Sequence, residues 1–106
     1  MVSVVALWSW ASEPADVGAV RSALNELVDH CETEHPLIQR LEWLEASKKD
    51  DDPVEFRWIE EYESRETMES DEYTDVCEGL WQPVKERAID GTFAGKAYEH
   101  GGGISR

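Results

Sequence analysis

Hydrophobic positions in this sequence repeat with two different periods, and the switches between them predict strands and helices. Residues 2–10 are rich in Val and Trp and are apolar on both faces, which predicts a strand that is covered on both sides. Residues 37–46 and 54–63 alternate between apolar and polar positions, as strands do, and a polar segment ending at Pro53 separates them. We therefore expect an antiparallel hairpin here, and a last strand over 92–100.

Two other segments carry apolar residues at spacings of three and four, which is the period of an amphipathic helix. The first runs over 17–31 and is stopped before Pro36. The second runs over 67–81, and Pro83 is predicted to end or kink it because proline lacks a backbone N–H. The order strand, helix, strand, strand, helix, strand is that of a ferredoxin-like α+β fold, with an antiparallel sheet and both helices on one face.

The length of 106 residues fits one domain, which we expect over 1–100, with 101–106 as a flexible tail. The helices cover one face of the predicted sheet and leave the other bare in a single chain. Because strand 2–10 is apolar on both sides, that bare face would expose large apolar groups. We expect a second copy of the chain to cover it, so that a homodimer closes an α/β barrel.

The alternation along the strands assigns side chains to the two faces of the sheet. The smaller aliphatic residues are assigned to the helix side: Val5, Leu7, Leu44 and Ile59. The aromatic residues and their polar neighbours are assigned to the barrel side: Trp8, Trp10, Phe56, Trp58, Glu60 and Tyr62. Glu55 and Arg57 would then lie beneath a helix, which counts against this choice, and the opposite parity stays open.

Acidic residues dominate the composition, with 24 Asp and Glu against 10 Lys and Arg and a net charge of −14. Nucleic acid and an anionic membrane surface would repel such a chain, so neither is expected as a partner. The charge favours solubility, and adaptation to high salt is an alternative interpretation. No segment has the pattern of a signal peptide or a membrane span, and Cys31 and Cys77 predict buried thiols, so we expect a cytoplasmic protein.

The segment FRWIEEYESRE, residues 56–66, places Glu60, Tyr62, Ser64 and Glu66 where the third strand enters the second helix. This succession of acid, aromatic, serine and acid resembles the antibiotic biosynthesis monooxygenase-like families of the dimeric α/β-barrel superfamily. The element order resembles them over nearly the whole chain. The resemblance implies a homodimer with a pocket in each subunit. The members of these families include cofactor-independent oxygenases of aromatic substrates, haem-degrading enzymes, polyketide cyclases and proteins with no known activity. The first class, acting on an apolar or aromatic substrate, is the leading expectation for this chain.

Two departures from that pattern bear on the chemistry. Monooxygenase-like members usually carry a His early in the second helix, where this chain has TMESDEY over 67–73. The haem-degrading branch carries a His where this chain has Cys77, and an Asn in the first strand, where this chain has none. Haem degradation is therefore not expected, and no cofactor is predicted.

The candidate catalytic residues are Glu60, Tyr62 and His100. A carboxylate among aromatic side chains has a raised pKa and can shuttle protons, and Tyr62 could donate a hydrogen bond to a ligand oxygen. His100, at the end of the last strand, could face the mouth of a pocket. Alternatively, Glu60 is paired with Arg57 or Arg40, or is simply exposed.

The aromatic residues Trp8, Trp10, Phe56 and Trp58 could line a pocket for a flat ligand, or they could fill a dimer core. His30 and His35 are five residues apart and are not expected to share a helix face, so no metal site is predicted. We expect a small-molecule enzyme or binder of the monooxygenase type. The alternative is a non-catalytic dimeric barrel, with a structural or ligand-binding role and no oxygenase activity.

Overall fold

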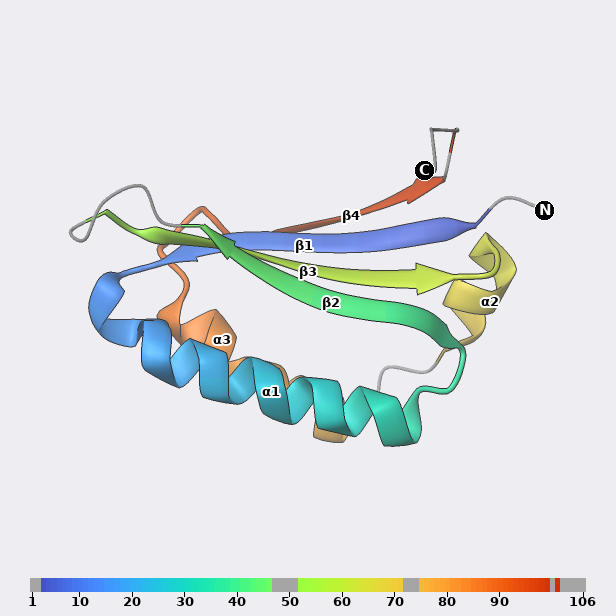
Figure 1. Ribbon diagram of the computed structural model, residues 1–106, viewed down its shortest axis with the longest axis horizontal. Helices are drawn as coiled ribbons and strands as arrows, with labels where there is room; N and C mark the ends of the chain where they lie inside the picture. The colour runs from blue at the N-terminus through green and yellow to red at the C-terminus, as the bar shows by residue number, and fades with distance from the viewer. Residues whose placement is uncertain (1–2, 47–51, 72–74, 100, 102–106) are drawn as a thin grey trace, which may run out of the picture.

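The computed structural model describes residues 3–46, 52–71, 75–99 and 101, and it forms one sheet with helices on one side. Figure 1 shows α1 and α3 lying beneath the sheet, while the shorter α2 lies at one end of it. The elements follow the chain as β1 (Val4–Ser12), η1 (Pro14–Asp16), α1 (Val17–Glu34), β2 (Ile38–Ala46), β3 (Val54–Tyr62), α2 (Arg65–Ser70), α3 (Asp75–Arg87) and β4 (Ala94–Glu99).

The sheet is antiparallel throughout, with the strand order β2-β3-β1-β4. This order and the placement of the helices confirm the ferredoxin-like α+β prediction. The predicted tail over 101–106 lies outside the described residues apart from Gly101. Within the part of the chain described, no helix is long and apolar enough to cross a membrane.

Helix boundaries follow local chemistry and differ from the predictions in the second half of the chain. Helix α1 ends at the C-cap His35, just before Pro36, as expected. The segment predicted as one helix contains two, and α2 begins where the Ser64 hydroxyl accepts the Thr67 N–H at 3.2 Å. Of the two outcomes predicted for Pro83, an end or a kink of the second helix, the structure contradicts the end, because α3 continues through Pro83 to Arg87.

The assignment of side chains to the two sheet faces is wrong, and the opposite parity holds: the residues assigned to the barrel side lie on the helix side, and those assigned to the helix side lie on the open face. The strand register places Trp8 opposite Trp58, and Trp10 opposite Phe56. These rings lie on the face that the helices cover, together with Glu60 and Tyr62, and they join one buried core with the apolar stripes of α1 and α3. Bulky rings fill the space between sheet and helices, and the charged Glu55 and Arg57 point to the open face.

The open face instead carries the residues that were assigned to the helices. Val5 and Leu7 are partly exposed there, and Leu44 is 50% exposed. The apolar positions are interrupted by ion pairs, Glu55 with Arg57 at 3.1 Å and Arg40 with Glu42 at 2.7 Å. The helices therefore cover the aromatic face within a single chain, and in the described part of the sheet the open face carries aliphatic side chains among ion pairs in place of the Trp-rich surface that motivated a homodimer.

Candidate functional site

Four polar side chains and one indole form a continuous hydrogen-bonded group beneath the sheet. Trp58 Nε1 donates to Glu60 Oε1 at 2.9 Å. The Tyr62 hydroxyl lies 2.9 Å from Glu60 Oε2 and 2.9 Å from Asp71 Oδ2. Asp71 Oδ1 in turn lies 2.9 Å from His35 Nδ1. The group connects the middle of the core with the ends of two helices.

Strand alternation and helix ends bring these residues together. Trp58, Glu60 and Tyr62 occupy every second position of β3, so they share the face that the helices cover. Asp71 is the C-cap of α2, and His35 is the C-cap of α1. The backbone of His35 leaves the helical region (φ −124°, ψ 66°), which directs its ring toward Asp71 instead of along the helix.

Glu60 is buried with 9% of its surface exposed, whereas the other charged residues of β3 are partly or largely exposed: Glu55, Arg57 and Glu61. The alternatives of a salt bridge or an exposed carboxylate are wrong, because Arg57 pairs with Glu55 and Arg40 with Glu42. Burial raises the pKa of Glu60, and the hydrogen bonds from Trp58 and Tyr62 lower it by less. The predicted raised pKa thus has the physical cause expected from the sequence.

The Tyr62 hydroxyl carries one hydrogen but has carboxyl oxygens at equal distances on two sides. The single hydroxyl hydrogen can be donated either to Glu60 or to Asp71, one at a time. Burial, followed by the charge and hydrogen bond of Glu60, raises the pKa of Tyr62. Tyr62 is therefore a neutral phenol that lies between two carboxyls.

A cavity of about 550 Å³ opens beside this group, between the sheet and the helices. Its walls combine aromatic rings, the polar group and sulfur: Trp8, Trp81, Glu60, Tyr62, Asp71 and Cys77. The volume falls within the usual range for small-molecule sites, which are mostly apolar with a few placed polar groups. The cavity is therefore suited to an apolar or aromatic molecule that carries one or two oxygens.

Three of the predicted site residues line this cavity: Trp8, Glu60 and Tyr62. The other aromatic candidates have different positions. Trp10 and Phe56 stack on each other in the core with ring centroids 5.6 Å apart, and Trp58 is fully buried behind Glu60. His100 lies outside the described residues.

Among the lining residues that sequence reasoning did not assign to a site are His35, Asp71 and Trp81. Trp81 lies at the end of the apolar stripe predicted over 67–81, and that pattern does not distinguish a cavity wall from a packed core. His35 and Asp71 occupy helix ends, where the helical repeat stops and the sequence pattern no longer predicts the direction in which a side chain points. The available signal was the polar pair itself, a His before Pro36 and an Asp directly after a serine-capped helix.

Gly95 on the edge strand β4 fixes one wall of the cavity. A Cβ added there would lie 2.7 Å from Cδ1 and Nε1 of the Trp8 indole, well inside contact distance. Trp8 and Gly95 are opposite each other in the β1–β4 register, so the indole lies across the glycine backbone. The small residue is therefore what lets this ring lie flat beside the cavity.

Solved structures with the same fold are similar to this chain over nearly its full length. SnoaB from Streptomyces nogalater, a cofactor-independent oxygenase, has a TM-score of 0.75 and 10% identity, covering 98% of each chain. A Deinococcus radiodurans protein provisionally named as an antibiotic biosynthesis monooxygenase has a TM-score of 0.75 and 15% identity, covering 97% of each chain. A similarly named protein from Nitrosomonas europaea has a TM-score of 0.70 and 18% identity, covering 94% of this chain and 89% of that one.

No family model matches the sequence, and no curated protein matches it. The structural similarity at these identities confirms the fold that the sequence resemblance implied, namely that of the antibiotic biosynthesis monooxygenase-like proteins. The chemistry of this chain has to be argued from its own cavity.

Proposed function

We propose that this protein binds an enolisable or phenolic aromatic molecule in the cavity beside Glu60 and Tyr62 and oxygenates it without a bound cofactor. The observation that carries the proposal is the adjacency of a buried carboxyl and a neutral phenol, 2.9 Å apart, on the wall of a largely apolar cavity. The similarity in fold to a cofactor-independent oxygenase supports the same reaction class.

Glu60 is the base in this proposal. A raised pKa makes the ionised carboxylate a stronger base than an exposed one, which suits removal of a proton from a weakly acidic C–H or O–H group. Tyr62 stays protonated and donates to the substrate oxygen on which negative charge develops. A substrate oxygen would take the place of one carboxyl as the acceptor of that hydrogen bond.

The reaction balances with dioxygen as the only co-reactant. Glu60 removes one hydrogen of an activated CH₂ group as a proton, and the resulting enolate adds dioxygen at carbon through electron transfer and C–O bond formation. The proton returns to the peroxide, and loss of water leaves a carbonyl group. One oxygen atom ends in the product and the other in water.

The cavity walls suit such a substrate. Trp8 and Trp81 present indole rings 6.3 Å apart, and flat aromatic molecules pack well against such surfaces. Their low polarity keeps water from the enolate and strengthens the hydrogen bond from Tyr62. The net charge of −14 also disfavours strongly anionic ligands, so a neutral substrate that ionises only when bound fits best.

The test measures binding and oxygen uptake separately, with an enolisable polycyclic ketone such as anthrone. Quenching of tryptophan fluorescence reports binding, and an oxygen electrode reports turnover. We expect Glu60→Gln to bind within a few-fold of wild type but to lose oxygen uptake by about 10²–10⁴-fold. Glu61→Gln changes the adjacent residue, which points to the open face, and should leave both unchanged.

Binding without oxygen uptake in the wild-type protein would contradict the oxygenase and favour the alternative of a non-catalytic ligand-binding protein. Absence of both binding and uptake would contradict the proposed site itself.

A further inference from the structure

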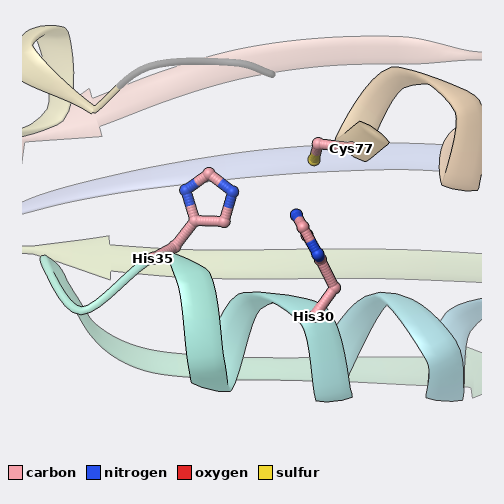
Figure 2. Close-up of side chains that lie close together, drawn as sticks. All are labelled: His30, His35 and Cys77. Atoms are coloured by element: carbon pink, nitrogen blue, oxygen red, sulfur yellow. The ribbon is translucent and has the colours of Figure 1, made fainter. Parts of the chain in front are cut away.

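His30, His35 and Cys77 form a cluster of metal-ligating side chains that the proposed oxygenase reaction does not use. One ligand atom of each lies within 4.8 Å of the others. Figure 2 shows the two imidazole rings projecting from the end of α1 toward α3, where the sulfur of Cys77 points back at them. The three residues come from two elements that lie side by side beneath the sheet.

The end of α1 explains why the two histidines meet. A spacing of five separates residues on a regular helix, and this was the reason for expecting no shared face. His35, however, is the C-cap and has left the helical conformation, so its ring turns back toward His30. The ring centroids lie 5.4 Å apart, and the expectation based on helical spacing is wrong.

Both histidines have a nitrogen that lacks a hydrogen-bond partner among the described residues. These are Nε2 of His30 and Nε2 of His35, and neither atom is accessible to solvent. The side chain of His35 is only 5% exposed. A buried polar atom without a partner destabilises the fold, so two such nitrogens close together call for a common partner.

Asp71 fixes which nitrogen of His35 is available. The Nδ1 of His35 lies 2.9 Å from Asp71 Oδ1 and 3.2 Å from Oδ2, so the N–H belongs on Nδ1 and donates to the carboxylate. The lone pair is then on Nε2, the nitrogen without a partner. This carboxylate–histidine arrangement is the usual support of a metal-binding imidazole.

We propose that His30, His35 and Cys77 bind one transition metal ion of the borderline or soft class, such as Zn²⁺ or Co²⁺. Two imidazoles and one thiolate suit these ions and disfavour Mg²⁺ and Ca²⁺, which prefer oxygen. Ligand atoms around a tetrahedral ion lie about 3.3–3.8 Å apart, and small side-chain rotations would bring the three ligand atoms, which already lie within 4.8 Å of one another, to that spacing.

The position of the cluster gives this metal site an open side. His35 and Cys77 line the cavity described above, so a fourth coordination position would face the bound small molecule. Three protein ligands with one open position are typical of catalytic metal sites, whereas structural sites are closed by four. The inference departs from the expectation of no metal site, and it stands independently of the proposed oxygenase, because it concerns metal binding alone.

The test uses Co²⁺ as a spectroscopic probe and Zn²⁺ as a competitor on the full chain. We expect one Co²⁺ per chain, a thiolate-to-cobalt charge-transfer band, and loss of that band when Zn²⁺ is added. Cys77→Ser should abolish the band and weaken binding at least tenfold. Cys31→Ser is the matched control, because Cys31 is also buried and lines the same cavity but is not part of the cluster.

Thermal unfolding of each variant establishes that it folds. His30 is only partly buried, so His30→Ala is the variant that should fold even if Cys77→Ser does not, and it should weaken Co²⁺ binding at least tenfold. Asp71→Asn should weaken binding by about 10–100-fold through its effect on His35. Absence of the charge-transfer band in wild type, or unchanged affinity in His30→Ala, would overturn the proposal by assigning any cobalt to surface carboxylates.

Discussion

Removal of the Tyr62 hydroxyl should destabilise the fold, because it breaks the polar group at its centre. In Tyr62→Phe the ring stays in place and only the oxygen is lost. Glu60 Oε2 then loses the hydrogen bond that it accepts from Tyr62, and 9% exposure leaves little access for water to replace the donor. Asp71 loses a donor too, but it keeps His35 and is more accessible.

The magnitude follows from this asymmetry. A buried polar group left without a partner costs about 1–3 kcal/mol, whereas the partly exposed Asp71 recovers most of its loss from water. We therefore expect the free energy of unfolding to fall by about 1–3 kcal/mol. For a domain of this size each kcal/mol corresponds to about 4–8 °C in Tm, so the expected drop is roughly 5–20 °C.

The assay is urea unfolding followed by tryptophan fluorescence, with Tyr98→Phe as the matched control. Tyr98 is 47% exposed on the open face, so removing its hydroxyl should change stability by less than about 0.5 kcal/mol. The Glu60→Gln background completes the test, since an energetic coupling of at least about 0.5 kcal/mol is expected between these neighbours. Equal losses for the two Tyr→Phe variants would refute the reasoning.

Three further predictions concern the pH response, the cavity wall and the open face. Burial raises the folded pKa of Glu60 above its unfolded value, so the contribution of Glu60 to stability is present at low pH and is lost as pH rises through the folded pKa. Over that rise Glu60→Gln should gain stability relative to wild type. A difference between the two proteins in urea unfolding that does not change with pH would contradict this. Gly95→Ala should displace the Trp8 indole and weaken binding of an aromatic ligand at least several-fold, whereas unchanged affinity in a fluorescence titration would show that the ring has room. We also predict a homodimer through the open face, as the fold resemblance implies. Leu7 lies on that face, so Leu7→Arg should lower the mass measured by light scattering to that of one chain. A wild-type protein that is monomeric at micromolar concentration would contradict this prediction.

Much of the fold follows from periodicity alone, because each strand and helix carries its own repeat. The alternation along residues 54–63 also placed Glu60 and Tyr62 on one face correctly. It did not say which face, because strand β1 is apolar on both sides and a shift of one position reverses every side chain. The deciding signal was Glu55 and Arg57, because turning their face toward the helices would bury more charged side chains than the opposite choice, which buries Glu60.

The rest of the site could not be predicted, because it is built where periodicity stops. Asp71 and His35 are helix caps, and the direction of a cap side chain depends on one residue leaving the helical conformation. Their meeting also requires two segments far apart in the chain to end at the same place beneath the sheet. The hydrogen bond between them joins residues 36 positions apart, which no local pattern encodes.

The close contact of the indoles has an optical consequence. Trp81 lies within 5.1 Å of Trp58, 5.8 Å of Trp10 and 6.3 Å of Trp8, measured between ring centroids. At such separations electronic excitation migrates among the rings faster than it is emitted. The four indoles therefore share their excitation energy, and a quencher that contacts only Trp8 lowers the fluorescence of all four.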